Sequence, residues 1–262
     1  MIRGLYTAAT GLDAGMRHMD AISNNLANVG TVGFKREQVL FQSLLDREIY
    51  RYTNNEPPAY LGQLGSGVNF RFGTPDWGAG LPLATNNPLD IALIDSGTES
   101  IDQLTFLAVE TLQGGQAYTR NGRLMVDSQG FLRTIAGAYV LGHNPLGAPQ
   151  RLRIADANDV KIATDGTISD ANGWQLGRLY LVSPGADAQL SRQGDSLWTI
   201  EGEVQPATNP QVMQGYLEQA NVQAVREMVN LITAMRLYET NSKIIQIQDE
   251  TLNKAVNEVG RL

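Results

Sequence analysis

The two ends of this chain carry the same seven-residue repeat of apolar side chains, and the middle follows a different pattern. Between Arg3 and about Val29 the repeat is formed by Leu5, Leu12, Met19 and Leu26, each followed three places later by Ala8, Gly15, Ile22 and Val29. Near the other end it is formed by Leu231, Tyr238, Ile245, Leu252 and Val259, with Met228 and Met235 as companions. Such spacing is typical of helices that pack along their length.

The second repeat predicts an unusually long helix. The stretch from Val222 to Val259 contains neither Pro nor Gly, and as a helix it would be roughly 55 Å long. A helix of that length needs a packed face to be stable. The nearest candidate partner is the N-terminal helix, so the two ends are predicted to form one helical domain.

The middle of the chain, from about 36 to 210, reads as β structure. It holds most of the 27 Gly and nearly all of the 10 Pro. AYTRNGRLMVDSQGFLRT reads as three strands joined by turns, and WQLGRLYLV reads as a further strand. The pairs Asn121-Gly122, Asp165-Gly166 and Asn172-Gly173 are compatible with type I′ turns.

These patterns predict an α+β fold in which terminal helices form a discontinuous coiled-coil domain around an inserted, mainly β domain. The predicted boundaries are 1–35 plus 211–262 for the helical domain, 36–85 for an extended or β connector, and 86–210 for the all-β domain. The apolar faces of the helices are wider than one seam requires, because further apolar residues lie beside the C-terminal stripe: Val225, Val229, Ile232, Ile244 and Ile247. Either the β domain or another protein molecule covers this surface.

Composition excludes several classes of function. With 20 basic and 27 acidic residues the net charge is −7, which speaks against a nucleic-acid or anionic-membrane partner. There is no Cys, and the two His, His18 and His143, have no clustered partner that would indicate a metal site or a catalytic triad. The sequence therefore predicts no enzyme: no catalytic, cofactor-binding or metal-binding residue and no small-molecule substrate. The N-terminus also lacks the apolar core of a cleavable signal peptide.

SNNLANVGTVGFKRE, residues 23 to 37, ends the N-terminal helix. Its Asn side chains favour helix ends and polar contacts, and Gly30 and Gly33 allow the chain to reverse. Phe34 is expected to anchor the reversed chain, with Lys35 and Arg36 in solvent. Asn25 and Asn28, at i and i+3, are expected to share a helix face and to bond backbone of this chain or of an adjacent subunit.

The same stretch resembles the Asn-Asn-Leu-Ala-Asn…Gly-Phe-Lys signature of bacterial flagellar axial proteins, the rod, hook and hook-associated subunits. TNNPLDIAL, AYTRNGRLMVDSQGFL and the segment from 214 to 252 resemble further blocks of that family in the same order. The length favours a basal-body rod protein, the distal-rod type before the proximal-rod type. The sequence departs from the family at DSGTESIDQLTF, residues 95 to 106, where the family has a Gly-Phe-Phe element.

The resemblance implies a structural subunit that polymerises through its terminal helices into the tubular drive shaft of the flagellar basal body, around the export channel. The implied partners are further copies of the chain, other rod and hook subunits, and the flagellar type III export apparatus, which would export the chain without signal cleavage. The predicted subunit-interface residues are Leu5, Leu12, Met19, Asn25, Leu26, Asn28, Met228, Leu231, Met235, Tyr238, Ile245 and Leu252. The alternative is a β-rich surface adhesin or carbohydrate-binding module with helical oligomerisation ends, in which Trp77, Trp174 and Trp198 would form a sugar platform.

Overall fold

The computed structural model describes residues 2–44, 47–52, 57–71, 73–95, 101–143, 149–154 and 160–259. The chain folds as two compact units. The helical unit comprises Met1–Ala27, Glu37–Pro75 and Val222–Leu262, and the β unit comprises Asn28–Arg36 and Asp76–Asn221. This α+β architecture, with a β domain inserted between terminal helices, confirms the predicted fold class.

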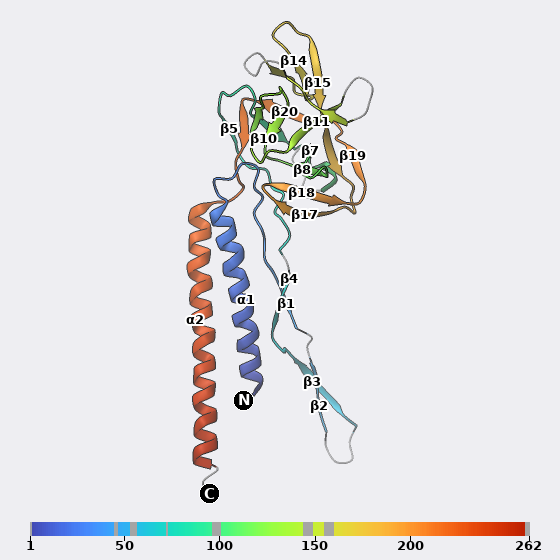
Figure 1. Ribbon diagram of the computed structural model, residues 1–262. Helices are drawn as coiled ribbons and strands as arrows, with labels where there is room; N and C mark the ends of the chain where they lie inside the picture. Colours follow the sequence, from blue (N-terminus) through green and yellow to red (C-terminus); the bar gives the residue numbers. More distant parts are fainter. Residues whose placement is uncertain are drawn as a thin grey trace. The chain divides into compact units, whose positions relative to one another are not determined.

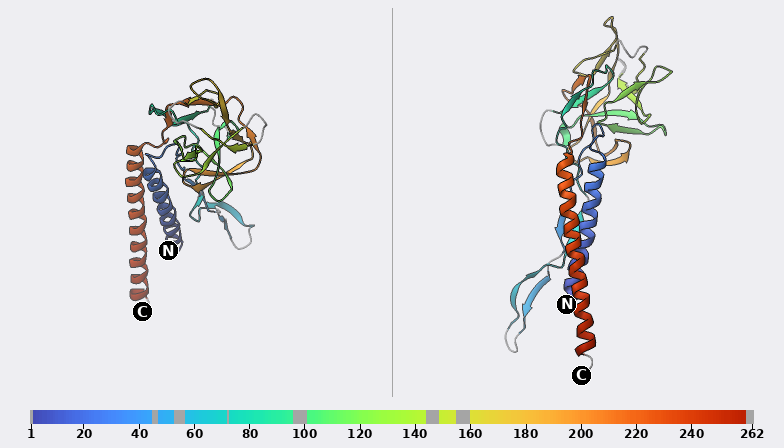
Figure 2. Two further views of the ribbon diagram at one scale, coloured as in Figure 1. Left: turned by 45° about the horizontal axis from the view of Figure 1, so that its top comes forward. Right: turned by 90° about the vertical axis from the view of Figure 1, so that its left-hand side faces the viewer.

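Two long helices dominate the helical unit and lie side by side, antiparallel (Figures 1 and 2). Helix α1 spans Ile2–Ala27, and α2 spans Ala224–Lys254 and continues into a π-helical turn, Ala255–Val259. Both lie within the stretches that the seven-residue repeat predicts as helical, apart from one residue at the start of α1. Among the described residues, no helix is apolar over a length sufficient to cross a membrane.

Four short strands complete the helical unit in two antiparallel pairs. Strand β1 (Leu40–Ser43) pairs with β4 (Val68–Arg71), and β2 (Arg47–Arg51) pairs with β3 (Ala59–Leu64). The β1–β4 pair contacts α1. Arg17 lies over the Phe70 ring at 5.5 Å, and His18 meets Phe41 edge-on at 5.4 Å. Most of the segment predicted as a connector, 36–85, therefore belongs to the same unit as the helices.

The β unit is built on one large branched antiparallel sheet. Along its main path lie β13 (Lys161–Ile162), β14 (Thr167–Ser169), β15 (Gln175–Leu179), β11 (Tyr139–His143), β7 (Phe106–Glu110), β8 (Gln116–Thr119), β18 (Leu197–Glu201) and β17 (Gln189–Gly194). Its branches are β9 (Leu124–Val126), β10 (Leu132–Thr134), β12 (Pro149–Arg151), β16 (Leu181–Pro184) and β19 (Val204–Pro206). Two small sheets pair β6 (Ile91–Ile94) with β20 (Gln211–Gln214) and β5 (Pro82–Ala84) with β21 (Tyr216–Glu218).

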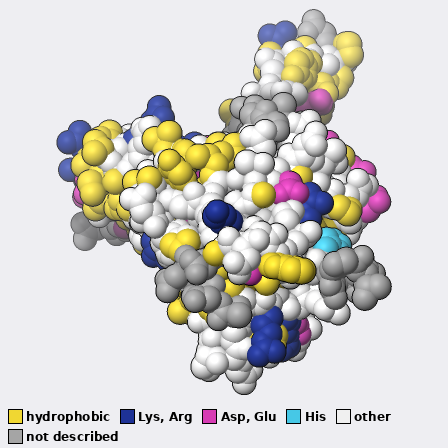
Figure 3. Space-filling model, turned by 90° about the horizontal axis from the view of Figure 1, so that it is seen from above, with side chains coloured by type: hydrophobic (Ala, Val, Ile, Leu, Met, Phe, Trp, Pro, Cys, Tyr) yellow, Lys and Arg dark blue, Asp and Glu magenta, His cyan; other side chains and the backbone are white. Residues whose placement is uncertain are grey.

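Both faces of the large sheet bury apolar side chains. In β7, Leu107 and Val109 point into one apolar cluster, and Phe106 and Ala108 point into the other. This alternation follows from the two-residue period of a strand. On the face of the molecule shown in Figure 3, Lys and Arg side chains form separate small groups, with Asp and Glu side chains among them.

The predicted strands are confirmed, but the predicted turns are not all of the expected kind. AYTRNGRLMVDSQGFLRT forms β8, β9 and β10 as predicted, whereas WQLGRLYLV, predicted as one strand, is divided into β15 and β16. Gly166 and Gly173 have positive φ whereas the residues before them do not, so these turns are not type I′. At Gly122 the chain instead passes close to the backbone of Ile91, and a Cβ atom at this position would collide with the Ile91 carbonyl oxygen.

The stretch that departs from the family, 95 to 106, lies partly outside the described residues. Its described part forms a short 3-10 helix, Ile101–Gln103, and the start of β7. Asp95 joins its two ends, because its carboxylate accepts a hydrogen bond from the Thr105 amide at 2.9 Å.

Candidate functional site

The seam between α1 and α2 is lined by small and polar side chains. The amide of Asn241 lies over Gly11, where a Cβ atom would be 3.0 Å from Nδ2, and the amide of Gln248 lies over Gly4 in the same way, at 3.3 Å. Ala8 on α1 and Ala234 on α2 are buried. Glycine on one helix allows the other to approach closely, so the two helices are close together at these positions.

The predicted stripe of α1 faces inward. Its four large residues are all partly buried: Leu5, Leu12, Met19 and Leu26. Their predicted companions Ala8, Gly15 and Ile22 are buried, whereas Val29 lies beyond the end of α1 and is exposed.

The predicted stripe of α2 divides into two sets. One set is partly buried and belongs to the inward side of the helix: Leu231, Tyr238, Ile245 and Leu252. Met228 and Met235 are 50% and 49% exposed, because the adjacent residues Glu227 and Ala234 are buried in their place. The two methionines therefore lie outside the buried part of the helix pair.

Apolar residues along α2 are left exposed, and we call seven of them the outer face of α2. It consists of Val225, Met228, Val229, Ile232, Met235, Ile244 and Ile247. Among the described residues of the helical unit, none covers it. Exposed apolar surface of this extent marks a site of association.

Asn25 is buried at the end of α1 with 2% of its surface exposed. Its Oδ1 accepts a hydrogen bond from the Glu37 amide at 2.9 Å, and its Nδ2 donates to the Glu37 carbonyl at 3.0 Å. Of the two partners predicted for this side chain, the structure shows backbone of the same chain. Asn28 lies one residue beyond the helix, so the predicted face shared with Asn25 does not exist; its Oδ1 accepts from the Thr31 hydroxyl at 3.2 Å.

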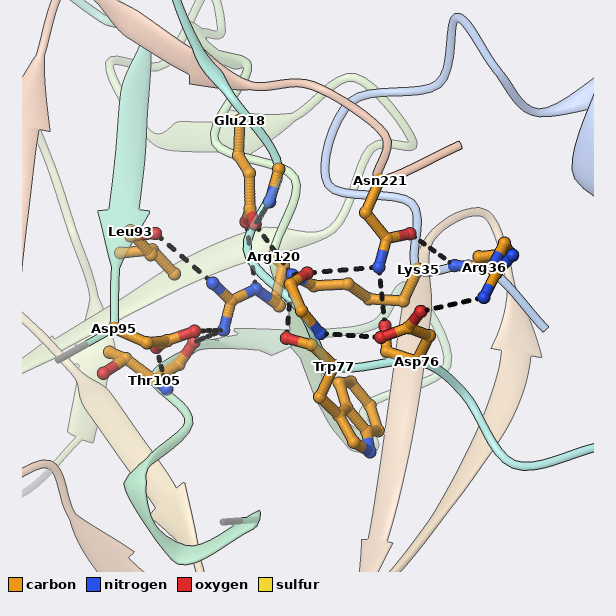
Figure 4. Close-up of polar contacts among 12 residues, drawn as sticks. Lys35, Arg36, Asp76, Trp77, Leu93, Asp95, Thr105, Arg120, Glu218 and Asn221 are labelled. Atoms are coloured by element: carbon orange, nitrogen blue, oxygen red, sulfur yellow. Dashed lines mark hydrogen bonds and ion pairs between the residues drawn. The ribbon is translucent and has the colours of Figure 1, made fainter. Parts of the chain in front are cut away.

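Four charged side chains are buried together in the β unit, and we call them the charge cluster: Lys35, Asp95, Arg120 and Glu218 (Figure 4). Glu218 receives Lys35 Nζ on one carboxylate oxygen at 2.8 Å and Arg120 Nε on the other at 3.0 Å. Asp95 forms a further ion pair with Arg120 at 2.7 Å. The cluster holds two positive and two negative charges and is internally balanced.

Backbone carbonyl groups bind the remaining donors of the charge cluster. Lys35 Nζ donates to the carbonyl of Gly78 at 2.9 Å, and Arg120 donates to those of Thr105 and Leu93 at 3.1 and 3.3 Å. The prediction that Lys35 lies in solvent is wrong, since its side chain is fully buried. Burial of an ammonium group is tolerated here because it is both paired and hydrogen-bonded.

The charges shift one another's pKa values. Burial lowers the pKa of Lys35, and the like charge of Arg120 lowers it further, while Glu218 acts in the opposite direction. Burial by itself raises the pKa of Glu218, but Arg120 and Lys35 outweigh this effect and hold the pKa below its ordinary value. Glu218 is therefore ionised at neutral pH despite its burial.

Around Lys35, the chain reversal after α1 is held by side chains of the β unit. Gly33 has φ of 67°, and a Cβ atom there would lie 2.6 Å from the Arg120 carbonyl oxygen. Arg192 stacks on the Phe34 ring at 4.6 Å and donates to the Lys35 carbonyl. Phe34 thus anchors the reversed chain as predicted, and the group that it contacts is the guanidinium of Arg192.

A second polar group adjoins the charge cluster in the β unit, and we call it the collar: Arg36, Asp76 and Asn221 (Figure 4). Arg36 pairs with Asp76 at 3.2 Å, and the Arg36 amide donates to Asn221 Oδ1 at 2.6 Å. Asn221 Nδ2 donates to the carbonyls of Asp76 and Gly78, at 2.8 and 3.1 Å.

Comparisons with known proteins show to which family the chain belongs. Its residues 5–35 match the family model described as "Flagella basal body rod protein", residues 100–170 match "Flagellar hook protein FlgE/F/G D1 domain", and residues 213–258 match "Flagellar basal body rod FlgEFG protein C-terminal". The "Flagellar basal-body rod protein FlgG" of Buchnera aphidicola subspecies Acyrthosiphon pisum is 34% identical, over 97% of this chain and 98% of its own. The chain belongs to the flagellar basal-body rod protein family.

Other rod proteins are similar to the same extent. The FlgG protein of Bacillus subtilis is 32% identical over 98% of this chain and 99% of its own. The FlgF protein of Caulobacter vibrioides is 31% identical over 94% of this chain and 93% of its own. The chain is thus similar along nearly its whole length to rod proteins with either name.

His18 and the three tryptophans belong to the other hypotheses, a metal or catalytic site and a sugar platform. His18 is half-buried; burial lowers its pKa, and the charge of Glu227 opposes this. Among the described residues, no group of His, Asp and Glu could hold a metal ion. Trp77 and Trp198 pack together at 4.9 Å beside the second apolar cluster, and Trp174 is exposed in the turn between β14 and β15. The three rings therefore form no common platform.

Proposed function

We propose that this rod-family protein is a structural subunit of the flagellar basal-body rod. In this role it polymerises through its terminal helices into the tubular drive shaft that transmits motor torque and encloses the export channel. The observation that carries the proposal is the outer face of α2, whose apolar side chains have no partner among the described residues. Further copies of the same helices, packed around a tube, would cover that face.

The proposed partners are further copies of the chain, other rod and hook subunits, and the flagellar type III export apparatus. The proposed location is the basal body, reached without cleavage of a signal peptide, and the proposed position is the distal rod. We retain the division into 1–35 plus 211–262, 36–85 and 86–210 as a proposal about domain boundaries. A non-enzymatic role accords with membership of the rod family.

The proposed subunit interface keeps the predicted residues and gains others. Met228 and Met235 are its strongest members, because both lie on the outer face of α2. We add the remaining residues of that face: Val225, Val229, Ile232, Ile244 and Ile247. Leu231, Tyr238, Ile245 and Leu252, with Leu5, Leu12, Met19 and Leu26 on α1, are only partly buried and would extend the interface at the edges of the seam. Asn28 keeps its place as a proposed interface residue, whereas Asn25, which bonds Glu37 of its own chain, is proposed to support the interface by holding the end of α1 in place.

Immunolabelling of basal bodies purified from cells that produce the protein tests the proposal. An antibody against the β unit should label the rod in negative-stain images. Label on the outer surface of intact cells, with none on purified basal bodies, would refute the proposal and favour the adhesin. No contact in the structure favours the adhesin.

A further inference from the structure

The chain changes between its two units four times, and three of these changes occur next to a residue of the collar. The chain leaves the β unit after Arg36, returns to it at Asp76 and leaves it again after Asn221. Each of these residues is the last or first residue of its segment in the β unit. One polar group therefore joins three connecting segments that are far apart in the sequence.

Backbone bonds align these segments into what we call the stem, residues 33–36, 76–80 and 218–221. The Gly33 amide donates to the Glu218 carbonyl at 2.8 Å, and the Asp76 amide donates to the Arg36 carbonyl at 2.7 Å. The Asn221 amide donates to the Phe34 carbonyl at 3.3 Å. The stem is thus a narrow bundle of three segments, each in contact with the others.

The charge cluster and the collar meet inside the stem. The carbonyl of Gly78 accepts from both Lys35 Nζ and Asn221 Nδ2, at 2.9 and 3.1 Å. Glu218 also accepts from the Gly80 amide at 3.0 Å. Every segment of the stem therefore contributes to one connected polar network, which Arg120 ties to the core of the β unit.

We infer that this network is a latch, which makes the three segments of the stem open and close together. Loss of any partner would leave a buried charge or amide of another segment unsatisfied, and polar groups in a low-dielectric interior are strongly coupled in this way. Lys35 and Glu218 are 183 residues apart, so the latch closes only when the segments around both residues have folded against each other. Given the proposed function, the latch would keep the stem closed while the subunit bears torque.

The alternative is that each segment is held separately by its own backbone bonds. Hydrogen–deuterium exchange of the purified full chain, followed by mass spectrometry of its peptides, separates the two ideas. The variant is Glu218→Gln, which keeps the shape of the side chain and removes its charge. The matched control is Glu110→Gln, which neutralises the partly exposed carboxylate paired with Arg151 at 2.7 Å.

With Glu218→Gln, peptides covering 28–36 and 74–80 should exchange roughly tenfold faster or more, as should the peptide that carries the change. Peptides of β6 and β7 should keep their rates, and Glu110→Gln should leave the stem unchanged. Faster exchange confined to 216–221 would overturn the latch. If Glu218→Gln prevents folding, the measurement is repeated with Asn221→Ala, which lies in the less buried collar. Faster exchange in all three segments of the stem supports the latch, and faster exchange confined to 216–221 overturns it.

This experiment is independent of rod assembly. The exchange rates are measured on the isolated subunit, so a failed latch would leave the labelling test of the proposed function unaffected. A protein found on the cell surface would likewise leave the exchange result intact.

Discussion

Replacing Asn25 with Leu should destabilise the subunit itself. The side chain is 2% exposed, and both of its polar atoms bond the backbone of Glu37. Leu has a similar volume, so the change removes two hydrogen bonds without opening a cavity. The sequence alone suggested loss of assembly at an unchanged melting temperature. The structure reverses that expectation, because the bonded backbone belongs to the same chain.

The expected loss is about 1–3 kcal/mol. A hydrogen bond contributes roughly 0.5–1.5 kcal/mol net, and two are removed. The cost stays in this range because Glu37 is only partly buried, so water can reach its released amide and carbonyl. Such a loss should accelerate exchange of the Glu37 amide about 5- to 150-fold.

Amide exchange at Glu37, measured by NMR together with thermal melting of the isolated subunit, tests this expectation. The control is Asn253→Leu, the same substitution at an exposed position of α2. Unchanged exchange and melting in Asn25→Leu, combined with a failure to build rods, would refute the reasoning. The bonds that matter would then be made to a neighbouring subunit.

Four further substitutions probe other parts of the molecule. Gly33→Ala should lower the melting temperature of the β unit by several degrees, since it combines positive φ with a Cβ atom 2.6 Å from a carbonyl oxygen. The pKa of Glu218 is held below its ordinary value of 4.5, so its contribution to stability is present above that pH and lost as the pH falls further. Melting temperatures measured from pH 6 to about pH 3 should fall less steeply in Glu218→Gln. Ile232→Asp and Ile245→Asp should both abolish swimming, but only Ile245→Asp, at the half-buried position, should also reduce the circular-dichroism helix signal of the isolated chain. Normal swimming of Ile232→Asp would show that the outer face of α2 is not an interface.

The architecture was predictable because it depends on local periodicity. A seven-residue repeat that occurs about four times in succession specifies a helix and its inward side, and α1 carries its predicted stripe on that side. The strands β8, β9 and β10 follow from alternation within a single stretch of sequence. These patterns are local, and they do not depend on which distant segment covers them.

The charge cluster was not predictable in the same way. A Lys after a helix end is usually solvated, and nothing within ten residues of Lys35 indicates that its partner is Glu218. The only available signal was that Lys35, Arg120 and Glu218 each fall within a block that resembles the rod family. A charged residue inside such a block, flanked by glycines that allow close approach, is a candidate for a buried pair.

The position of Met228 and Met235 shows why a heptad alone does not define a seam. Helix α1 presents glycine at positions 4 and 11, and the side chains opposite are the amides of Gln248 and Asn241. Close approach selects small and polar residues of α2 for the seam, and the adjacent large apolar residues are turned outward. Periodicity determines that α2 has an apolar side, and the shape of the partner determines which residues it buries.

This division between seam and outer face also determines when the helices are stable. Fully burying a Val, Ile or Met side chain contributes about 1.5–3 kcal/mol, and roughly half the surface of the outer face is still exposed. Covering its seven side chains would therefore contribute on the order of 5–10 kcal/mol per subunit. The inward side of α2 buries Ala234 and partly buries Leu231, Tyr238, Ile245 and Leu252, so it supplies only part of the apolar stabilisation of the helix. The remainder depends on assembly, so the helix signal of the purified protein should rise with protein concentration. A helix signal that is complete and constant down to the lowest measurable concentration would mean that the seam alone holds the pair together.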